Sequence, residues 1–277
     1  MHLQGPFEPP NGALMILNPK AKTLVANRRG SSVWKVETDS GPYAVKVGYP
    51  SKTHTWTALA PAREAAVLRQ LTPERILSAE WEHGTWNAQP WRHGDSLYEL
   101  WEPHRFETSP PAPDLGEALS CAAALAALHE KGWVHGDVQP AHFVIGRSAG
   151  TFLIDVALAQ GGKVPREYDF SYHGCLVHYE APEISGSVLR TGYAVPTRES
   201  DVYGLGASLF ISATGSRHVD YPDDAERWEQ RRAIVDKPHR DVNVPGVLGK
   251  LIDAMMSRRI ADRPSSIEVC EELRAAM

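Results

Sequence analysis

The sequence predicts an α+β fold in two parts, a small strand-rich part followed by a larger, mainly helical part. Short runs with alternating apolar side chains fill the chain from about Leu14 to Arg92. After the proline-rich stretch Ser109–Asp114, SPPAPD, apolar residues instead recur at helical spacing. The 277 residues suffice for one large domain or two lobes with a substantial core.

In the first part we expect several strands and one helix. The helix is Pro61–Leu71, because a proline suits the first turn and Ala65, Leu68 and Leu71 share one face. The strand-like runs are SSVWKVET (31–38), YAVKV (43–47), AEWEHGTW (79–86) and PWRHG (90–94).

The second part begins with a helix at Leu115–His129, where apolar residues repeat at helical spacing and Gly132 can end the pattern. Later apolar patterns predict further helices at 201–213, 225–234, 247–257 and 266–275.

Composition excludes several functional classes. The net charge of −5 is not gathered into a block, which argues against a nucleic-acid binder or a membrane-surface protein. The N-terminal residues do not have the pattern of a signal peptide, and the apolar runs are too short to span a bilayer. The three cysteines are scattered and form neither a disulfide framework nor a zinc pattern, so we expect a cytoplasmic, reducing environment.

Lys46 lies within the strand-like run YAVKVGY. An unpaired ammonium among apolar residues is costly, so Lys46 needs a carboxylate or phosphate partner. Glu64, in the only helix predicted for this part, is the candidate. The alternative is an edge lysine with a solvated tip.

Acidic residues mark the second part. Asp137 follows His135 and Gly136 in the stretch GWVHGDVQPAHFVIG, and Asp155 ends an apolar, strand-like run where a carboxylate can be presented to a metal. Three further motifs come later, YEAPEI (179–184), SDVYGLGASLF (200–210) and ADRPSS (261–266).

In their order and spacing these motifs resemble the protein kinase superfamily. The resemblance runs from about Leu24 to Leu273 and involves Lys46, Glu64, Asp137, Asp155, Ala181-Pro182-Glu183, Asp201 with Gly206, and Arg263. It implies a bilobal kinase-like fold, with an N-terminal tail at 1–13, a small β lobe at 14–94 and a larger helical lobe at 95–277. The chain is therefore similar to bacterial homologues of eukaryotic-type Ser/Thr kinases.

The resemblance also implies roles for single residues. Lys46 would bind the α- and β-phosphates of ATP and Glu64 would orient it. Asp137 would accept the proton of the substrate hydroxyl, and Asp155 would bind Mg²⁺, or Mn²⁺ in its place. Structural roles fall to Glu183 with Arg263, a buried ion pair, and to Asp201, which would brace the catalytic loop. His93-Gly94-Asp95 repeats the tripeptide but falls at the expected hinge and is read as a coincidence.

Four departures from the kinase pattern concern catalysis. His142 replaces the loop asparagine and offers an imidazole nitrogen in place of a hard oxygen; it is a metal ligand, a proton-transfer group or a cap that bonds to the backbone. Gln139 replaces the loop lysine and removes a positive charge near the transferred phosphoryl group. Leu176 replaces a threonine. Asp155 is followed by Val-Ala instead of Phe-Gly.

The glycine-rich loop is also altered. Aligning Val33 with the family's valine places Ala26, Arg28 and Ser31 at the glycine positions. Arg28 and Arg29 would bind an anion such as an ATP phosphate, or are simply solvated. The activation segment, 155–183, contains Ser171 but no threonine, and Gly136 replaces the arginine that grips a phosphorylated loop, so we expect no switching by phosphorylation there.

Three functions stay open at this point. The first is a divergent Ser/Thr phosphotransferase, slow or dependent on a partner. The second is a pseudokinase that binds a peptide or partner enzyme, and the third is a lyase acting on phosphoserine or phosphothreonine. The pattern HGDxQPxH (135–142) is also similar to kinase-like proteins of thioamitide and class V lanthipeptide pathways, which modify a precursor peptide together with a lyase.

Overall fold

The computed structural model describes residues 5–51, 55–107, 112–147 and 150–277. The chain forms two compact units and confirms the predicted α+β fold class. The first unit comprises the residues up to Arg92 together with 156–158 and 162–170. The second comprises the rest of the chain, so the main chain first passes from one unit to the other between Arg92 and His93 and returns to the first unit at 156–158 and 162–170. Residues 109–111 of the proline-rich stretch lie outside the described residues.

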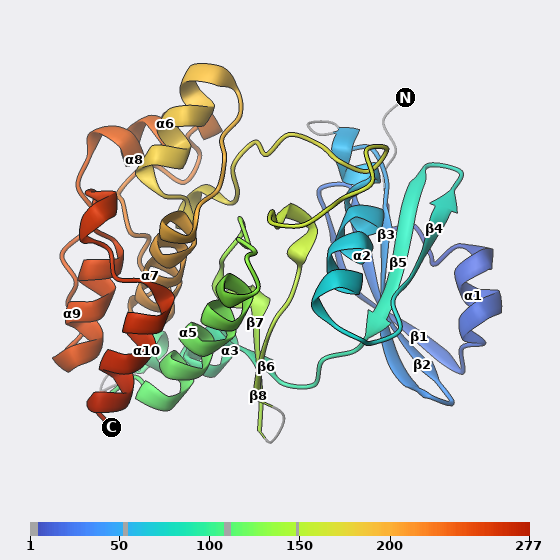
Figure 1. The fold of residues 1–277 in the computed structure, drawn as a ribbon, viewed down its shortest axis with the longest axis horizontal. Coiled ribbons are helices and arrows are strands. Elements are labelled where there is room, and N and C mark those ends of the chain that lie inside the picture. Colours follow the sequence, from blue (N-terminus) through green and yellow to red (C-terminus); the bar gives the residue numbers. More distant parts are fainter. Residues whose placement is uncertain (1–4, 52–54, 108–111, 148–149) are drawn as a thin grey trace. The chain divides into compact units, whose positions relative to one another are not determined.

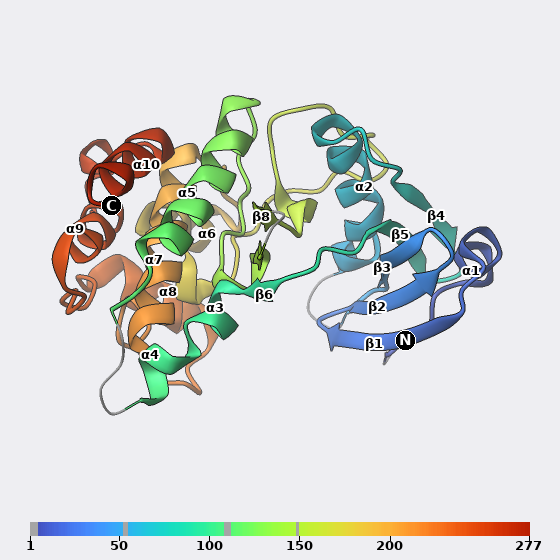
Figure 2. The same ribbon diagram turned by 90° about the horizontal axis from the view of Figure 1, so that it is seen from below.

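The first unit contains an antiparallel five-stranded sheet with the strand order β1-β2-β3-β5-β4 (Figure 2). Its strands are β1 (Ala21–Arg28), β2 (Ser31–Thr38), β3 (Gly41–Gly48), β4 (Leu77–Trp81) and β5 (Gly84–Pro90). β3 lies at the centre and is paired on both sides, so its residues are held in a fixed register.

Two of the predicted strand runs need correction. The run 79–86 is not a single strand, since it contains the end of β4, a tight turn and the start of β5. The run 90–94 is not a strand either. The ladder between β3 and β5 ends at the pair Tyr43–Pro90, because β3 begins at Gly41 and has little further backbone to offer.

Two helices flank this sheet. The predicted helix is α2 (Ala60–Leu71), and a second helix, α1 (Asn11–Leu17), was not predicted because its sequence NGALMIL covers only two turns. Ala13 and Leu17 of α1 pack into one apolar core with side chains of the sheet, namely Trp34, Val36, Val45, Val47, Trp86 and Ala88. The segment that the sequence suggested as a tail is thus partly helical and covers part of the sheet.

The second unit is mainly helical (Figure 1). Its helices are α3 (Leu97–Leu100), α4 (Glu102–Phe106), α5 (Leu115–Glu130), α6 (Pro182–Thr191), α7 (Arg198–Thr214), α8 (Arg227–Asp236), α9 (Gly246–Met255) and α10 (Ser266–Ala275). A small antiparallel sheet of β6 (Asp95–Ser96), β7 (Phe143–Gly146) and β8 (Gly150–Leu153) lies beside α5. Short 3₁₀ turns occur at Thr55–Ala58 in the first unit and at Pro140–His142, Val177–Tyr179 and Ile260–Asp262 in this one. Within the described residues, no helix has the length and apolar character needed to cross a membrane.

Helix α7 is the core element of the second unit, with most of its residues buried. It begins three residues earlier than predicted because the side chains of Thr197 and Ser200 form a reciprocal N-terminal cap. Gly206 allows close packing against α9, since a Cβ atom there would lie 2.8 Å from the Cβ of Met255. The capped first turn of α7 presents Asp201 to the interior.

Candidate active site

The first unit brings Lys46 and Glu64 together, the contact that the sequence predicted. Lys46 lies on the central strand β3, and its Nζ donates to Oε1 of Glu64 on α2 over 2.7 Å. The side chains are 13% and 1% exposed, so the pair is shielded from water far better than a surface ion pair.

Asn87 holds the other oxygen of Glu64 and was missed by sequence reasoning. From β5, its amide donates to Oε2 of Glu64 over 2.9 Å and to the carbonyl of Pro61 over 2.8 Å. The Glu64 carboxylate is therefore bonded at both oxygens, which fixes its orientation. The available signal was the alternation of polar residues in GTWNAQP, where Thr85, Asn87 and Gln89 share one face of a strand and are all buried.

Arg28 lies at the end of β1, next to a very short turn. It pairs with Ser31 in the ladder, so only Arg29 and Gly30 connect β1 to β2. Both turn residues have positive φ, +50° and +84°, as a two-residue hairpin turn of this type requires. Arg28 and Arg29 are exposed, and anion binding by Arg28 remains a prediction.

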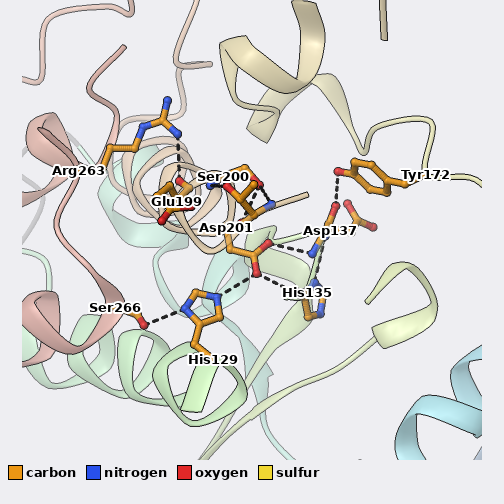
Figure 3. Close-up of polar contacts among 11 residues, drawn as sticks. His129, His135, Asp137, Tyr172, Glu199, Ser200, Asp201, Arg263 and Ser266 are labelled. Atoms are coloured by element: carbon orange, nitrogen blue, oxygen red, sulfur yellow. Dashed lines mark hydrogen bonds and ion pairs between the residues drawn. The ribbon is translucent and has the colours of Figure 1, made fainter. Parts of the chain in front are cut away.

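In the second unit, the loop that contains Asp137 is held by the buried side chain of Asp201 (Figure 3). The Asp201 carboxylate is 2% exposed and accepts the main-chain N–H of His135 over 2.6 Å and that of Gly136 over 2.9 Å. Gly136 has φ +76°, a left-handed conformation that glycine adopts without steric cost. The bracing role expected of Asp201 is therefore present as two charge-assisted hydrogen bonds.

A buried polar chain continues beyond Asp201 and was not predicted. Nε2 of His129, at the end of α5, lies 3.1 Å from the Asp201 carboxylate, and Nδ1 of His129 lies 2.9 Å from Oγ of Ser266 on α10 (Figure 3). An ionised carboxylate only accepts, so Nε2 carries the hydrogen. This chain connects the loop to three helices of the unit.

His135 is a neutral imidazole that bridges two backbone groups near the loop. Its Nε2 lies 3.0 Å from the carbonyl oxygen of Ile154 and must donate, while its Nδ1 accepts the N–H of Asp137 over 3.2 Å. The residue is fully buried, and burial lowers the pKa of the imidazole, with the nearby His142 acting in the same direction. The neutral form is the one that both contacts require.

Asp137 has two differently held carboxylate oxygens. Gln139 donates to Oδ2 over 3.1 Å, whereas Oδ1 is buried and has no hydrogen-bond partner among the described residues. An orphaned buried carboxylate oxygen is costly, so it is a functional signal. Asp137 and Gln139 were both expected at a catalytic centre from the sequence.

His142 lies between Asp137 and Asp155. Its Nδ1 is 2.8 Å from the main-chain carbonyl of Asp137, so Nδ1 carries the hydrogen and its Nε2 points to Oδ2 of Asp155 at 3.4 Å. The imidazole nitrogen and the carboxylate oxygen both offer lone pairs, so together they suit a shared cation. The backbone-capping role expected for His142 is thus present, and its second nitrogen is still directed at Asp155. Asp155 itself has φ +63°, an uncommon conformation for a non-glycine residue.

These donors fit a divalent cation that arrives together with other ligands. In the described part of the chain, no group of three or more His, Cys, Asp or Glu side chains is placed to hold a metal ion alone. Mg²⁺ ordinarily takes one or two carboxylates and fills its remaining positions with water and substrate phosphates. Asp155 fits that requirement, and the imidazole of His142 favours Mn²⁺ or a later metal over Mg²⁺.

The segment after Asp155 returns to the loop through Tyr172. The Tyr172 hydroxyl donates to the carbonyl of Gly136 over 2.6 Å (Figure 3). Glu180 then forms a buried ion pair with Arg231 of α8, at 2.7 and 3.0 Å, and accepts the N–H of Cys175. Burial raises the pKa of the Cys175 thiol. None of these contacts was predicted from the sequence.

Glu183 and Arg263 form the expected structural ion pair. The two guanidinium nitrogens donate to the two carboxylate oxygens over 2.6 and 2.8 Å, and the Arg263 side chain is fully buried. This two-point geometry fixes the start of α6 to the residues that precede α10.

Comparison with known proteins agrees with the motif pattern. No family model matches the chain. Serine/threonine-protein kinase PknK of Mycobacterium tuberculosis is 31% identical over 166 residues, which is 58% of this chain and 14% of PknK. Serine/threonine-protein kinase PkaA of Streptomyces coelicolor is 29% identical over 181 residues, 62% of this chain and 31% of PkaA. Mitosis inhibitor protein kinase wee1 of Schizosaccharomyces pombe is 26% identical over 224 residues, 76% of this chain and 24% of wee1. The chain thus spans less than a third of the length of these relatives.

Proposed function

We propose that this chain, a protein-kinase-like protein related to the protein kinase superfamily, transfers phosphate from ATP to Ser or Thr of a protein or peptide, weakly or with the help of a partner. The kinase relatives support the general class of reaction. The further proposal of a natural-product precursor peptide as substrate, with a lyase as partner enzyme, depends on the pattern of residues 135–142 alone.

One observation carries the catalytic proposal, the orphaned oxygen of Asp137. Gln139 fixes the side chain through Oδ2, and within the described residues the buried Oδ1 has no partner. The other two buried carboxylates of the site, those of Asp201 and Glu64, are by contrast bonded at both oxygens. Oδ1 of Asp137 instead keeps unused acceptor capacity, which a substrate hydroxyl would satisfy once it displaces the atoms that cover this oxygen.

The reaction assigns one role to each retained residue. Oδ1 of Asp137 accepts the hydroxyl proton while the hydroxyl oxygen bonds to the γ-phosphorus; the bond to the bridging oxygen breaks and ADP leaves. Lys46 would stabilise charge on the phosphates, and Asp155 with His142 would hold a divalent cation, whose chemistry would be to neutralise further charge. Gln139 brings no positive charge to the transferred group, so we expect slow transfer.

A non-catalytic binding module is the second candidate, and the turn Arg29–Gly30 favours it. A two-residue turn offers fewer backbone N–H groups to phosphates than the glycine-rich loop of kinases. In this function the loop of Asp137 would hold a peptide or partner enzyme without chemistry.

Nucleotide binding is the first test. We expect ATP with Mg²⁺ or Mn²⁺ to raise the melting temperature; at ATP about 100 times Kd the stabilisation is about 2.7 kcal/mol. The Lys46→Ala variant should lose most of this shift. Lys35→Ala is the matched control, because Lys35 lies on the neighbouring strand and pairs with Glu37. No shift for the wild type, or equal shifts for both variants, would exclude the ATP-binding role of Lys46.

Phosphate transfer is the second test. The purified chain, alone and with the products of adjacent genes, is incubated with ATP and a Ser/Thr peptide library, and incorporation is measured by mass spectrometry. We expect Asp137→Asn to abolish incorporation. Asp95→Asn should retain it, because Asp95 belongs to the second, exposed His-Gly-Asp tripeptide. If ATP binds but the wild type transfers nothing under either condition, the binding-module function is correct.

A further inference from the structure

Helix α2 contacts a second group of residues through Arg63, which directly precedes Glu64. The side chain of Arg63 is 4% exposed, an unusual degree of burial for a guanidinium group. Nη1 donates to the main-chain carbonyl of Ala157 and Nε donates to Oδ1 of Asp169 over 3.3 Å. The guanidinium also lies 5.1 Å from the ring centre of Phe170. Burial lowers the pKa of Arg63, and Asp169 counteracts this effect.

Arg63 thus contacts the segment 156–170, and two further contacts hold this segment against other residues of the first unit. Gln70, seven residues after Arg63 and hence on the same helix face, donates to the carbonyl of Lys163 over 2.7 Å and accepts its N–H over 3.1 Å. Trp56 stacks on Phe170 at 4.7 Å between ring centres. Helix α2 therefore holds the segment 156–170 near its start, its middle and its end.

The negative charge that Arg63 contacts is the carboxylate of Asp169, which does not depend on a modification. An arginine cluster often orders a loop only after the loop is phosphorylated, because the phosphate supplies the charge that the arginine binds. Here Asp169 supplies a carboxylate that is always present, and the segment 155–183 contains no threonine. The contact of Arg63 with Asp169 needs no modification in order to form.

From these contacts we infer that Arg63 and Asp169 form a phosphorylation-independent clamp, which holds α2 in the position where Glu64 meets Lys46. Arg63 is thus a positioning residue. Glu64 is fixed by Asn87 on one side of the helix, and the helix is fixed by the clamped segment on another. The link to ATP depends on the proposed function, whereas the clamp itself can be measured without ATP.

Trypsin provides the direct measurement, because Lys163 and Arg166 lie within the clamped segment. Cleavage follows the fraction of time that the segment is open. We expect Arg63→Gln to accelerate cleavage at these two sites about tenfold and to increase hydrogen exchange in α2. Asp169→Asn should accelerate it about threefold, since Asp169 is half exposed.

A control variant is available on the same helix. Arg69 donates to the carbonyl of Ile76 and to Ser78 near β4, and none of the hydrogen bonds described for its side chain reaches the clamped segment. Arg69→Gln should therefore leave cleavage at Lys163 and Arg166 at the wild-type rate. The combined variant Arg63→Gln with Asp169→Asn should be opened no further than Arg63→Gln alone, because both remove one contact. Even if Arg63→Gln fails to fold, the exposed Asp169→Asn still tests the clamp.

Three outcomes would overturn the inference. Cleavage of Asp169→Asn at the wild-type rate would show that the pair holds nothing. Faster cleavage after phosphatase treatment of the wild type would show that a phosphate is required. Faster cleavage of Arg63→Gln with unchanged exchange in α2 would show that Arg63 holds the segment but does not position Glu64. If the wild type binds no ATP, the proposed function fails while cleavage and exchange still decide the clamp; if it does bind, we expect Arg63→Gln to weaken ATP binding severalfold.

Discussion

The Asp201→Asn variant tests how much the conformation of the loop 135–137 depends on one buried charge. Asparagine keeps the shape of the side chain but has a single acceptor oxygen. Of the main-chain N–H groups of His135 and Gly136, one keeps an acceptor, and the other is left buried and unpaired. The unpaired group costs about 1–3 kcal/mol, and the remaining bond loses its charge assistance, about 1 kcal/mol more. The variant also weakens the contact of residue 201 with His129. In total we expect a loss of about 3–5 kcal/mol in unfolding free energy.

Urea unfolding measures this loss, and hydrogen exchange localises it. The amides of His135 and Gly136 should exchange much faster in Asp201→Asn than in the wild type. Asp223→Asn is the control, because Asp223 is 93% exposed in its pair with Arg217, and such pairs contribute at most about 1 kcal/mol. A loss for Asp201→Asn no larger than that of Asp223→Asn, with the two amides still protected, would refute the argument.

Two further predictions concern other parts of the chain. Gly30→Ala should destabilise the protein by more than about 2 kcal/mol in urea unfolding, because the new Cβ would lie 2.5 Å from the carbonyl oxygen of Tyr49. Gly41 also has positive φ, but a Cβ there would meet open space, so Gly41→Ala should cost less in the same assay. Burial lowers the pKa of His218 from 6.5 to about 4. Between these pH values the unfolded chain binds more protons than the folded chain, so stability falls as pH drops, by about 3 kcal/mol at most. His218→Gln should flatten the measured dependence of stability on pH in this window, and parallel curves for the two proteins would contradict the assignment.

The sequence was sufficient to predict contacts in which a charged residue type has few alternatives. A lysine in an apolar strand needs an anionic partner, and Glu64 was the acidic residue of the one helix predicted nearby. The contacts of Asp201 and of Glu183 with Arg263 were implied by the resemblance to protein kinases. The prediction for Lys46 succeeded because burial of a charge restricts the number of acceptable partners.

Other parts of the site could not be predicted, because residues such as asparagine, histidine and tyrosine occur in many structural roles. Asn87 is an unremarkable residue in a strand until the register of β5 places it beside Glu64. His129 and Tyr172 act on the loop from sequence positions whose proximity only folding creates. The missed helix α1 is too short to have a reliable periodic pattern.

By itself, the sequence determined the fold class, the order of the motifs and the residues with a kinase-like pattern, since these depend on local periodicity, residue type and spacing. Only the tertiary structure decided which oxygen of Asp137 is left without a partner among the described residues, where the second nitrogen of His142 points and how Arg63 is used. The physical reason is that hydrogen-bond satisfaction depends on the direction and burial of individual atoms, and both arise from contacts between distant segments.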